Sequence, residues 1–274
     1  GVGGPADWMV FPGSAEELRG VLRLLGENDV PRLVVGAGSD LVVRDGGFRG
    51  ACIVLARHLS GSKIVGDRAI EAMAGESLAS LLRLSREASL AGLEFVATIP
   101  GTVGGGVVTN VGAFGSCFAD ILESVAVLDA HGRERAIEGR SLRAAYRRIE
   151  LPEGAVVVRA RFALEPGARE RIEETVARHR EHRLRTQPLG EASAGCIYKN
   201  PSPGEPAGRL IDQAGLTGLR LGGASVSALH ANYIVNEGGA TAREVLALID
   251  EVRRRVSEKH GVLLEPEVRI VGEE

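Results

Sequence analysis

The sequence contains no apolar run that approaches the roughly 20 residues needed for a membrane-spanning helix. Its first residues also lack the basic segment followed by an apolar one that marks a secretory signal. We therefore expect a cytoplasmic protein with no membrane partner. Because the chain begins with Gly1 rather than Met, we expect a native leader to be missing from it.

Cysteine and lysine are both scarce. The three cysteines, Cys52, Cys117 and Cys196, are far apart and show no C-x-x-C spacing. This pattern fits neither a disulfide framework nor a zinc site, and we expect no metal. Nearly all basic charge is arginine, so Lys199, three residues after Cys196, stands out as a candidate functional residue.

Strong net charge is absent too. The formal net charge is −3, with 44% hydrophobic and 25% charged residues, which is typical of a globular protein and argues against a nucleic-acid partner. The length of 274 residues exceeds the roughly 100 to 200 expected for one domain. We place a domain boundary between residues 165 and 166, where Pro166 and Gly167 follow a predicted strand.

The apolar spacing predicts mixed helices and strands. Ser14 to Glu17 has the pattern of a capping box ahead of a helix, so the chain opens as strand, helix, strand. Other predicted helices are 77–88, 168–185, 207–213 and 241–260, and other predicted strands are 32–35, 41–43, 51–55, 155–164, 233–235 and 263–271.

Two glycine-rich segments lie in the first half. Gly36-Ala-Gly-Ser-Asp40 follows a predicted strand, but Leu41 replaces the third glycine of a Rossmann fingerprint, which disfavours that fold. The segment from Ile99 to Gly115 has too many glycines for a helix and is too apolar for a flexible linker. Two such segments favour a backbone-lined surface for a phosphate-bearing ligand, with plain turns as the alternative.

The segment Ser193 to Pro201 combines a thiol, an ammonium group and an amide. A thiol beside a cation titrates below its usual pKa of about 8.5, so Cys196 is a candidate for proton chemistry. The alternative is a buried, inert cysteine, which is the commoner state. On the predicted final strand, Glu265, Glu267 and Arg269 would point to one face, as a site or as a structural ion pair.

His179 and His182 are three residues apart on a predicted helix, but no third ligand is evident. A solvated basic helix face explains them better than a metal site does.

Taken together, eight ordered segments resemble the UDP-N-acetylenolpyruvoylglucosamine reductases, the MurB flavoenzymes of bacterial cell-wall synthesis. The resemblance covers nearly the whole chain. The segments are Gly3–Ala6, Gly36–Leu41, Gly92–Phe95, Ile99–Gly105, Asn110–Gly115, Ala194–Pro201, His230–Asn236 and Glu265–Arg269.

The resemblance implies an α+β fold. Residues 1–165 would form a two-lobed FAD-binding domain of the vanillyl-alcohol-oxidase (PCMH) type, and residues 166–274 an α+β substrate-binding domain whose last strand, about 263–271, packs back toward the flavin. The implied cofactor-binding residues are Gly36, Ala37, Gly38, Ser39, Asp40, Leu41, Ile99, Pro100, Gly101, Thr102, Gly104, Gly105, Asn110, Gly112 and Ala113.

The implied reaction is the NADPH-dependent reduction of UDP-N-acetylglucosamine enolpyruvate to UDP-N-acetylmuramate through FAD, in peptidoglycan precursor synthesis. Hydride addition builds negative charge on the substrate carboxylate, which Arg147 would stabilise and to which a protonated Glu267 would donate a hydrogen bond. Cys196 would then protonate the neighbouring carbon. Tyr146, Lys199, Asn200 and Arg269 match substrate-binding positions.

The chain departs from the family pattern at two positions. Cys196 stands where serine is usual, and a thiol is at least as able to donate a proton. Asp40 stands where asparagine is usual, which places a carboxylate near the implied pyrophosphate. The chain resembles the compact subclass without the substrate-capping tyrosine loop, and we expect a monomer. Two alternatives are another FAD oxidase or dehydrogenase that acts on a different substrate and a flavin- or nucleotide-binding module without catalysis.

Overall fold

A computed structural model describes residues 1–201 and 203–274. The chain forms two compact units, each built from separate stretches: unit 1 contains Gly1–Asp7, Gly38–Arg49 and Arg183–Glu274, and unit 2 contains Trp8–Ala37 and Gly50–His182. This division differs from the predicted boundary at residues 165 and 166. The predicted domains are defined by which ligand each one binds, whereas the two units are defined by contacts within the chain. The assignment of residues 1–165 to the cofactor and 166–274 to the substrate stays a prediction.

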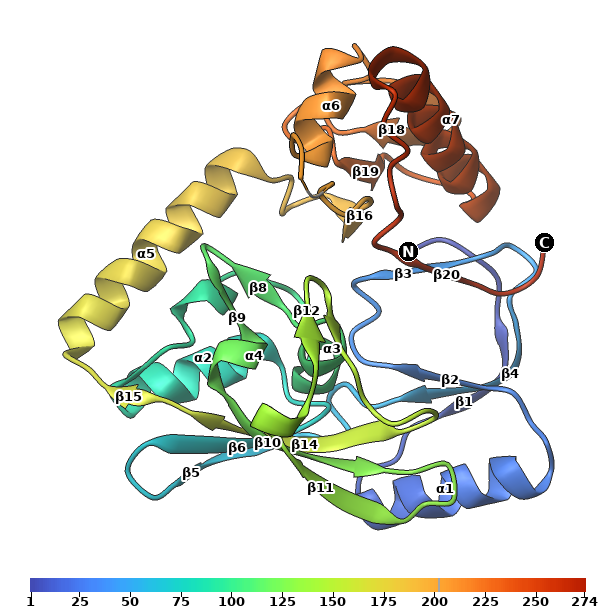
Figure 1. Ribbon diagram of the computed structural model, residues 1–274. Coiled ribbons are helices and arrows are strands. Elements are labelled where there is room, and N and C mark those ends of the chain that lie inside the picture. Colours follow the sequence, from blue (N-terminus) through green and yellow to red (C-terminus); the bar gives the residue numbers. More distant parts are fainter. Residues whose placement is uncertain (202) are drawn as a thin grey trace. The chain divides into compact units, whose positions relative to one another are not determined.

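Unit 2 is built around a five-stranded antiparallel sheet with strand order β11-β10-β14-β6-β5 (Figure 1). Its strands are β5 (Ser62–Val65), β6 (Ala69–Met73), β10 (Leu122–Leu128), β11 (Glu134–Glu138) and β14 (Val156–Ala163). A second sheet has the order β1-β4-β2, in which β2 (Arg32–Val35) runs parallel to β4 (Phe48–Val54) and β1 is Ala6–Val10. Strands β1 and β4 have residues in both units.

Two helices of unit 2 begin at serine N-caps, the first of which the sequence predicts. Ser14 accepts a hydrogen bond from the Glu17 N–H at the start of α1 (Ala15–Glu27), although the Glu17 carboxylate bonds Gly13 rather than Ser14. Ser77 caps α2 (Leu78–Glu87) in the same way. The predicted apolar face of α2 is confirmed, since Leu78, Leu81, Leu82 and Ser85 are all buried.

The remaining elements of unit 2 are short apart from α5, which extends into unit 1. They are β7 (Leu90–Ala91), η1 (Glu94–Val96), α3 (Val103–Val108), β8 (Gly112–Ala113), β9 (Ser116–Cys117), α4 (Phe118–Ile121), η2 (Gly139–Ser141), β12 (Ala144–Ala145), β13 (Arg148–Ile149), β15 (Glu165–Pro166) and α5 (Arg169–Thr186).

Unit 1 packs two helices on a four-stranded antiparallel sheet of order β16-β19-β18-β17 (Figure 1). The strands are β16 (Ala192–Cys196), β17 (Arg220–Leu221), β18 (Ala224–Val226) and β19 (Tyr233–Asn236), and the helices are α6 (Ala207–Gln213) and α7 (Ala242–His260). A separate parallel pair joins β3 (Leu41–Val43) to β20 (Arg269–Val271). The predicted capping box of α7, Thr241 with Glu244, is confirmed.

A carboxylate distant in sequence also holds the start of α7. Asp45 accepts hydrogen bonds from the N–H groups of Ala242 at 2.8 Å and Arg243 at 2.9 Å, two of the donors that a helix start leaves unpaired. The bond from Arg243, and then the bond from Ala242, lower the pKa of Asp45 below its ordinary value. The segment containing β3 is thereby attached to the longest helix of unit 1.

The prediction that the segment from Ile99 to Gly115 contains no helix is wrong. Helix α3 occupies Val103–Val108, with Thr102 as its N-cap, despite three consecutive glycines. The reason is packing: a Cβ on Gly104 would lie 2.9 Å from Ala74 Cβ, and one on Gly106 would lie 2.7 Å from the Phe118 ring. Close approach to these neighbours offsets the poor helix propensity of glycine.

The predicted final strand is also too long. Only Arg269–Val271 forms a strand, and residues 263–268 contribute a single bridge in which Pro266 lies opposite Tyr198. Proline has no N–H, so it interrupts the ladder at that point. Glu265, Glu267 and Arg269 therefore do not alternate along one regular strand face.

Among the described residues, no helix combines the length and the apolar character required to cross a bilayer. No group of three or more His, Cys, Asp or Glu side chains in the described part of the chain is arranged to hold a metal ion.

Gly106→Ala should destabilise the protein by about 1 to 3 kcal/mol, because the added methyl group overlaps Phe118 in a packed core. The matched control is Gly105→Ala on the same helix, where the nearest heavy atom is 3.5 Å away and the residue is exposed. That change should be neutral or stabilising by up to about 1 kcal/mol. Urea denaturation of both variants measures the difference, and equal stabilities would contradict the packing explanation.

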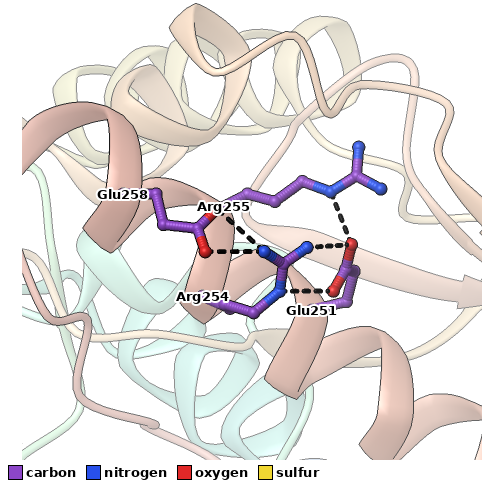
Figure 2. A network of polar contacts seen from close by, with 4 residues as sticks. All are labelled: Glu251, Arg254, Arg255 and Glu258. Atoms are coloured by element: carbon purple, nitrogen blue, oxygen red, sulfur yellow. Dashed lines mark hydrogen bonds and ion pairs between the residues drawn. The ribbon is translucent and has the colours of Figure 1, made fainter.

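The outer face of α7 has a four-residue ion network (Figure 2). Arg254 donates two hydrogen bonds to the Glu251 carboxylate, at 2.9 and 2.8 Å, and two to Glu258. Arg255 adds a third bond to Glu251. The bonds from Arg254 and then Arg255 lower the pKa of Glu251 from 4.5 to about 2.

The lowered pKa predicts a pH-dependent effect of Glu251→Gln. The folded protein favours the ionised carboxylate, so its stabilisation is complete above about pH 4.5 and disappears as the pH falls through about 2. Glu251→Gln should therefore be less stable than the unmodified chain at pH 7 and equally stable near pH 2. Thermal unfolding between pH 2 and 7 tests this. Glu258→Gln, which loses bonds to Arg254 alone, is the control and should show the smaller loss at pH 7.

Candidate functional site

The segment that contains Cys196 lies between two hydrogen-bonded neighbours in unit 1. On one side Cys196 is opposite Tyr233, and the Ile197 N–H donates to the Asn232 carbonyl at 2.9 Å. On the other side the Lys199 N–H donates to the Glu265 carbonyl at 2.9 Å, and the Glu267 N–H donates to the Ile197 carbonyl at 2.7 Å. The backbone around Cys196 is therefore fixed from both edges.

A bulge between Ser193 and Cys196 sets the direction of the thiol. Gly195 has φ of 77°, which is the left-handed region that favours glycine. A Cβ at this position would meet no atom closer than the Ser39 carbonyl oxygen at 3.9 Å, so the conformation and not crowding requires glycine. Bulges of this kind re-aim side chains next to functional sites.

The buried side chain of Asn232 continues the strand pairing past Cys196. Its amide oxygen accepts from the Tyr198 N–H at 3.0 Å, and its amide nitrogen donates to the Tyr198 carbonyl at 2.8 Å. Asn232 is 3% exposed and Tyr198 1%. One side chain thus satisfies both backbone groups of a buried residue, which would otherwise be left without partners at considerable cost.

Tyr233 gathers several polar groups around the thiol. Its phenol donates to Gln187 Oε1 at 3.1 Å and forms a side-chain hydrogen bond with Cys196. Burial, followed by the neighbouring Cys196 and Glu267, raises the pKa of Tyr233 above its ordinary value, and Arg183 opposes that shift. Two predicted catalytic residues, Cys196 and Glu267, thus both lie close to Tyr233 in unit 1.

The predicted substrate-binding residues of unit 1 have structural partners as well. Lys199 Nζ pairs with Glu265 Oε1 at 2.5 Å, and the Glu265 side chain is 71% exposed. Ion pairs at the surface are weak, so Lys199 can exchange this partner for a ligand. Asn200 Oδ1 accepts from the Ala207 N–H at 3.0 Å, at the start of α6. The Arg269 N–H donates to the Asp40 carbonyl at 3.1 Å, so Arg269 lies beside the loop that precedes β3.

Arg147 belongs to unit 2, in the turn between β12 and β13. It has φ of 60°, uncommon for a residue with a side chain, and its guanidinium lies 5.6 Å from the Tyr146 ring centroid. Asn110 holds this hairpin, because its Nδ2 donates to the Ala145 carbonyl at 3.1 Å while its Oδ1 accepts from the Ala119 N–H at 2.9 Å. Asn110, predicted to contact the cofactor, thus anchors the turn that positions Arg147.

The two glycine-rich segments meet within unit 2. A Cβ on Gly36 would lie 2.3 Å from Thr102 Oγ1, so only glycine permits this approach. Ala37 and Gly105 are both exposed, and a methyl group at one and no side chain at the other leave the backbone accessible. Residues of this kind fit a large cofactor whose phosphates are bound by backbone amides.

The first amides of α3 are not available for that purpose. The Val103 N–H donates to the Glu76 carbonyl at 2.9 Å and the Gly104 N–H to the Ala74 carbonyl at 2.8 Å. A contact of Gly104 with the cofactor would therefore have to use another atom. Ile99, Pro100 and Gly101 lie in the loop between η1 and α3, and Gly112 and Ala113 form β8 of the β8–β9 hairpin. Their contacts with the cofactor stay predictions.

The prediction of a solvated face for His179 is wrong. Its ring stacks on Phe114, with centroids 3.8 Å apart and planes 4° from parallel, and its Nδ1 is 3.2 Å from the Glu94 carbonyl. His182, by contrast, is exposed and meets the Phe114 ring edge-on at 5.6 Å. Phe114, in the glycine-rich segment, has φ of 55°, and the stack helps to hold it there.

Comparison with known proteins agrees with this arrangement. The FAD binding domain family matches residues 6–137, and the C-terminal domain of UDP-N-acetylenolpyruvoylglucosamine reductase matches residues 187–271. The reductase of that name from Geobacter sulfurreducens is 43% identical over 274 residues, covering 100% of this chain and 90% of its own length. The chain belongs to the UDP-N-acetylenolpyruvoylglucosamine reductase family. The reductase from Rubrobacter xylanophilus is 45% identical over 99% of the chain.

A solved structure of the family supports the fold. The crystal structure of this reductase (MurB) from Thermus caldophilus superposes with a TM-score of 0.79 at 38% identity, covering 96% of this chain and 91% of that one. The predicted α+β fold, with an FAD-binding domain followed by a C-terminal domain of the reductase family, is confirmed. FAD as cofactor and NADPH as co-substrate follow from membership of the family.

Sequence reasoning assigned no role to Tyr233, Asn232 or Gln187. The first two lie in the motif His230–Asn236, directly before the apolar Ile234 and Val235 of the predicted strand, and polar residues next to a buried strand are the signal that could have identified them.

Asn232→Asp should destabilise the protein by about 2 kcal/mol or more, because the carboxylate cannot donate to the Tyr198 carbonyl and carries charge into a buried position. Asn236→Asp is the matched control: Asn236 Oδ1 acts as an acceptor from the N–H groups of Gly238 and Ala240, which a carboxylate can replace. That variant should be close to neutral. Denaturant unfolding of both compares them, and a stable Asn232→Asp would show that the amide is dispensable.

Proposed function

We propose that this chain reduces UDP-N-acetylglucosamine enolpyruvate to UDP-N-acetylmuramate with NADPH, in peptidoglycan precursor synthesis, and that Cys196 is its proton donor. The observation that supports this most is the match to the reductases along the whole chain, together with a thiol held at a fixed backbone position between Tyr233 and Glu267. The glycine-rich segments Gly36–Leu41 and Ile99–Ala113 would hold FAD, which would supply the hydride chemistry that links NADPH to the enolpyruvyl double bond.

The residues have separate tasks in this proposal. Arg147 supplies fixed positive charge for the substrate carboxylate as negative charge builds on it, and Glu267, when protonated, donates a hydrogen bond to the same group. Cys196 gives its proton to the carbon next to the one that receives hydride. Lys199, Asn200, Arg269 and Tyr146 hold the substrate, for which Lys199 exchanges its ion pair with Glu265 for a substrate oxygen.

The remaining parts of the proposal concern the setting of the reaction. The cofactor lies against Gly36–Leu41 and the segment from Ile99 to Ala113, residues 1–165 bind the flavin and residues 166–274 the substrate. The enzyme acts in the cytoplasm as a monomer, with a UDP-sugar as its partner and no membrane or nucleic acid.

NADPH oxidation by the purified protein, measured with and without UDP-N-acetylglucosamine enolpyruvate, tests the activity. The yellow colour of bound flavin and oxidation that depends on the enolpyruvyl sugar are the expected results. NADPH oxidation that does not depend on the enolpyruvyl sugar would indicate a different oxidoreductase. The absence of NADPH oxidation, with or without flavin colour, would indicate a binding module without catalysis.

Cys196→Ala should leave the reduction of the flavin by NADPH near normal and slow its reoxidation by the enolpyruvyl sugar by about 10²- to 10⁴-fold, the usual contribution of a positioned general acid. Stopped-flow absorbance of the flavin separates the two half-reactions. Cys196→Ser is the control, because a hydroxyl can also donate a proton; it should keep substantial turnover with an altered pH profile. Unchanged turnover of Cys196→Ala would refute the assignment.

A further inference from the structure

The phenol of Tyr233 faces two acceptors with a single proton. It donates to Gln187 Oε1 at 3.1 Å and is also hydrogen-bonded to the side chain of Cys196. A phenol oxygen can accept one bond while its hydrogen donates another. When Cys196 is a thiol, its S–H can donate to the phenol oxygen while the phenol donates to Gln187. When Cys196 is a thiolate, the phenol hydrogen has a charged acceptor as an alternative to Gln187.

The fold prevents Tyr233 from leaving this position. Tyr233 is directly opposite Cys196 in the β16–β19 pair and is 6% exposed. Its backbone N–H donates to the His230 carbonyl and its carbonyl accepts from the Ser227 N–H, both at 2.9 Å. The His230 ring meets the tyrosine ring edge-on, with centroids 5.0 Å apart. The hydroxyl hydrogen can rotate, but the ring stays beside the thiol.

The charged groups around Tyr233 come from helix α5, from strand β16 and from the segment before β20. Arg183 at the end of α5 is 8% exposed and favours negative charge near the phenol, whereas Glu267 and an ionised Cys196 disfavour it. Burial raises the pKa of Tyr233 above its ordinary value, so the phenol remains a neutral donor at neutral and moderately alkaline pH. Tyr233 can therefore donate a hydrogen bond to a thiolate without losing its own proton.

We propose that Tyr233 is a positioning residue for Cys196, which orients the thiol and stabilises the thiolate by turning its O–H from Gln187 to Sγ. The inference depends on the proposed function in one respect, that Cys196 is the proton donor. During the step the S–H bond breaks, a C–H bond forms at the substrate carbon, and the electron pair of the S–H bond stays on sulfur. A proton from water later restores the thiol, and the phenol hydrogen returns to Gln187.

The direct test is the pKa of the Cys196 thiol in Tyr233→Phe, measured without substrate. The rate of alkylation of the holoenzyme by iodoacetamide is followed against pH, with peptide mapping to separate Cys196 from Cys117 and from Cys52, whose burial raises its pKa. Loss of one hydrogen bond to a charged acceptor should raise the thiol pKa by about one to two units. Reoxidation of the flavin by the enolpyruvyl sugar should slow about tenfold, with KM nearly unchanged.

Two further variants separate this role from a general effect on packing. Tyr198→Phe removes another buried phenol of unit 1, one that donates to the Ile249 carbonyl, and should leave the Cys196 pKa unchanged. Gln187→Leu removes the acceptor that competes for the phenol hydrogen and should lower the Cys196 pKa. Opposite shifts in Tyr233→Phe and Gln187→Leu are not expected from packing changes.

The outcomes distinguish the inference from the proposed function. If Cys196→Ala loses turnover while Tyr233→Phe changes neither the thiol pKa nor reoxidation, the role of Tyr233 is refuted and the proton donor stands. If Cys196→Ala keeps its turnover, the donor assignment fails, whatever the thiol pKa shows. If Tyr233→Phe does not fold, Gln187→Leu decides, since an unchanged or raised Cys196 pKa there overturns the switch. In a Cys196→Ala background, Tyr233→Phe should not slow reoxidation further.

Discussion

The buried amide of Asn232 holds the backbone on which the rest of the site depends. Strand β16 ends at Cys196, and without a substitute partner the N–H and carbonyl of Tyr198 would be buried and unpaired. The side chain of Asn232 supplies both partners from a position next to Tyr233. Asn232 therefore holds the segment after Cys196, and its neighbour Tyr233 supplies the polar group opposite Cys196. Asn232 and Tyr233, at the start of β19, thus hold the segment that contains Cys196, while the bulge at Gly195 in β16 sets the direction of the thiol.

Glycine serves two purposes in this chain, and the sequence alone does not tell them apart. Gly104 and Gly106 let a short helix approach Ala74 and Phe118, whereas Gly195 permits a left-handed backbone ahead of Cys196. Gly36 permits close contact with Thr102, which joins two segments that lie far apart in the sequence. The glycine-rich segment from Ile99 to Gly115, which the sequence predicts to bind a ligand, is consequently also part of the core.

The elements that were predicted well have local causes. Helices α2, α6 and α7 follow from apolar spacing and, in α2 and α7, from side-chain caps, and their predicted bounds agree with the structure to within about one residue. Helix α3 and the shortened last strand depend on non-local contacts, with Phe118 and Ala74 in one case and with Tyr198 opposite Pro266 in the other. In α3, packing overrides the low helix propensity of glycine. In the last segment, proline interrupts the strand pairing.

The sequence by itself determined the family and the cofactor, because these depend on ordered motifs that remain readable without coordinates, whereas the roles of the individual site residues stay predictions. It also identified Cys196 as unusual at its position. Tertiary structure decided the surroundings of that residue: strand register places Tyr233 opposite Cys196, a hydrogen bond across 46 positions joins Tyr233 to Gln187, and Asn232 pairs with the backbone of Tyr198. A hydrogen bond requires two groups within about 3 Å, and for residues so distant in sequence only the folded backbone brings them to that distance.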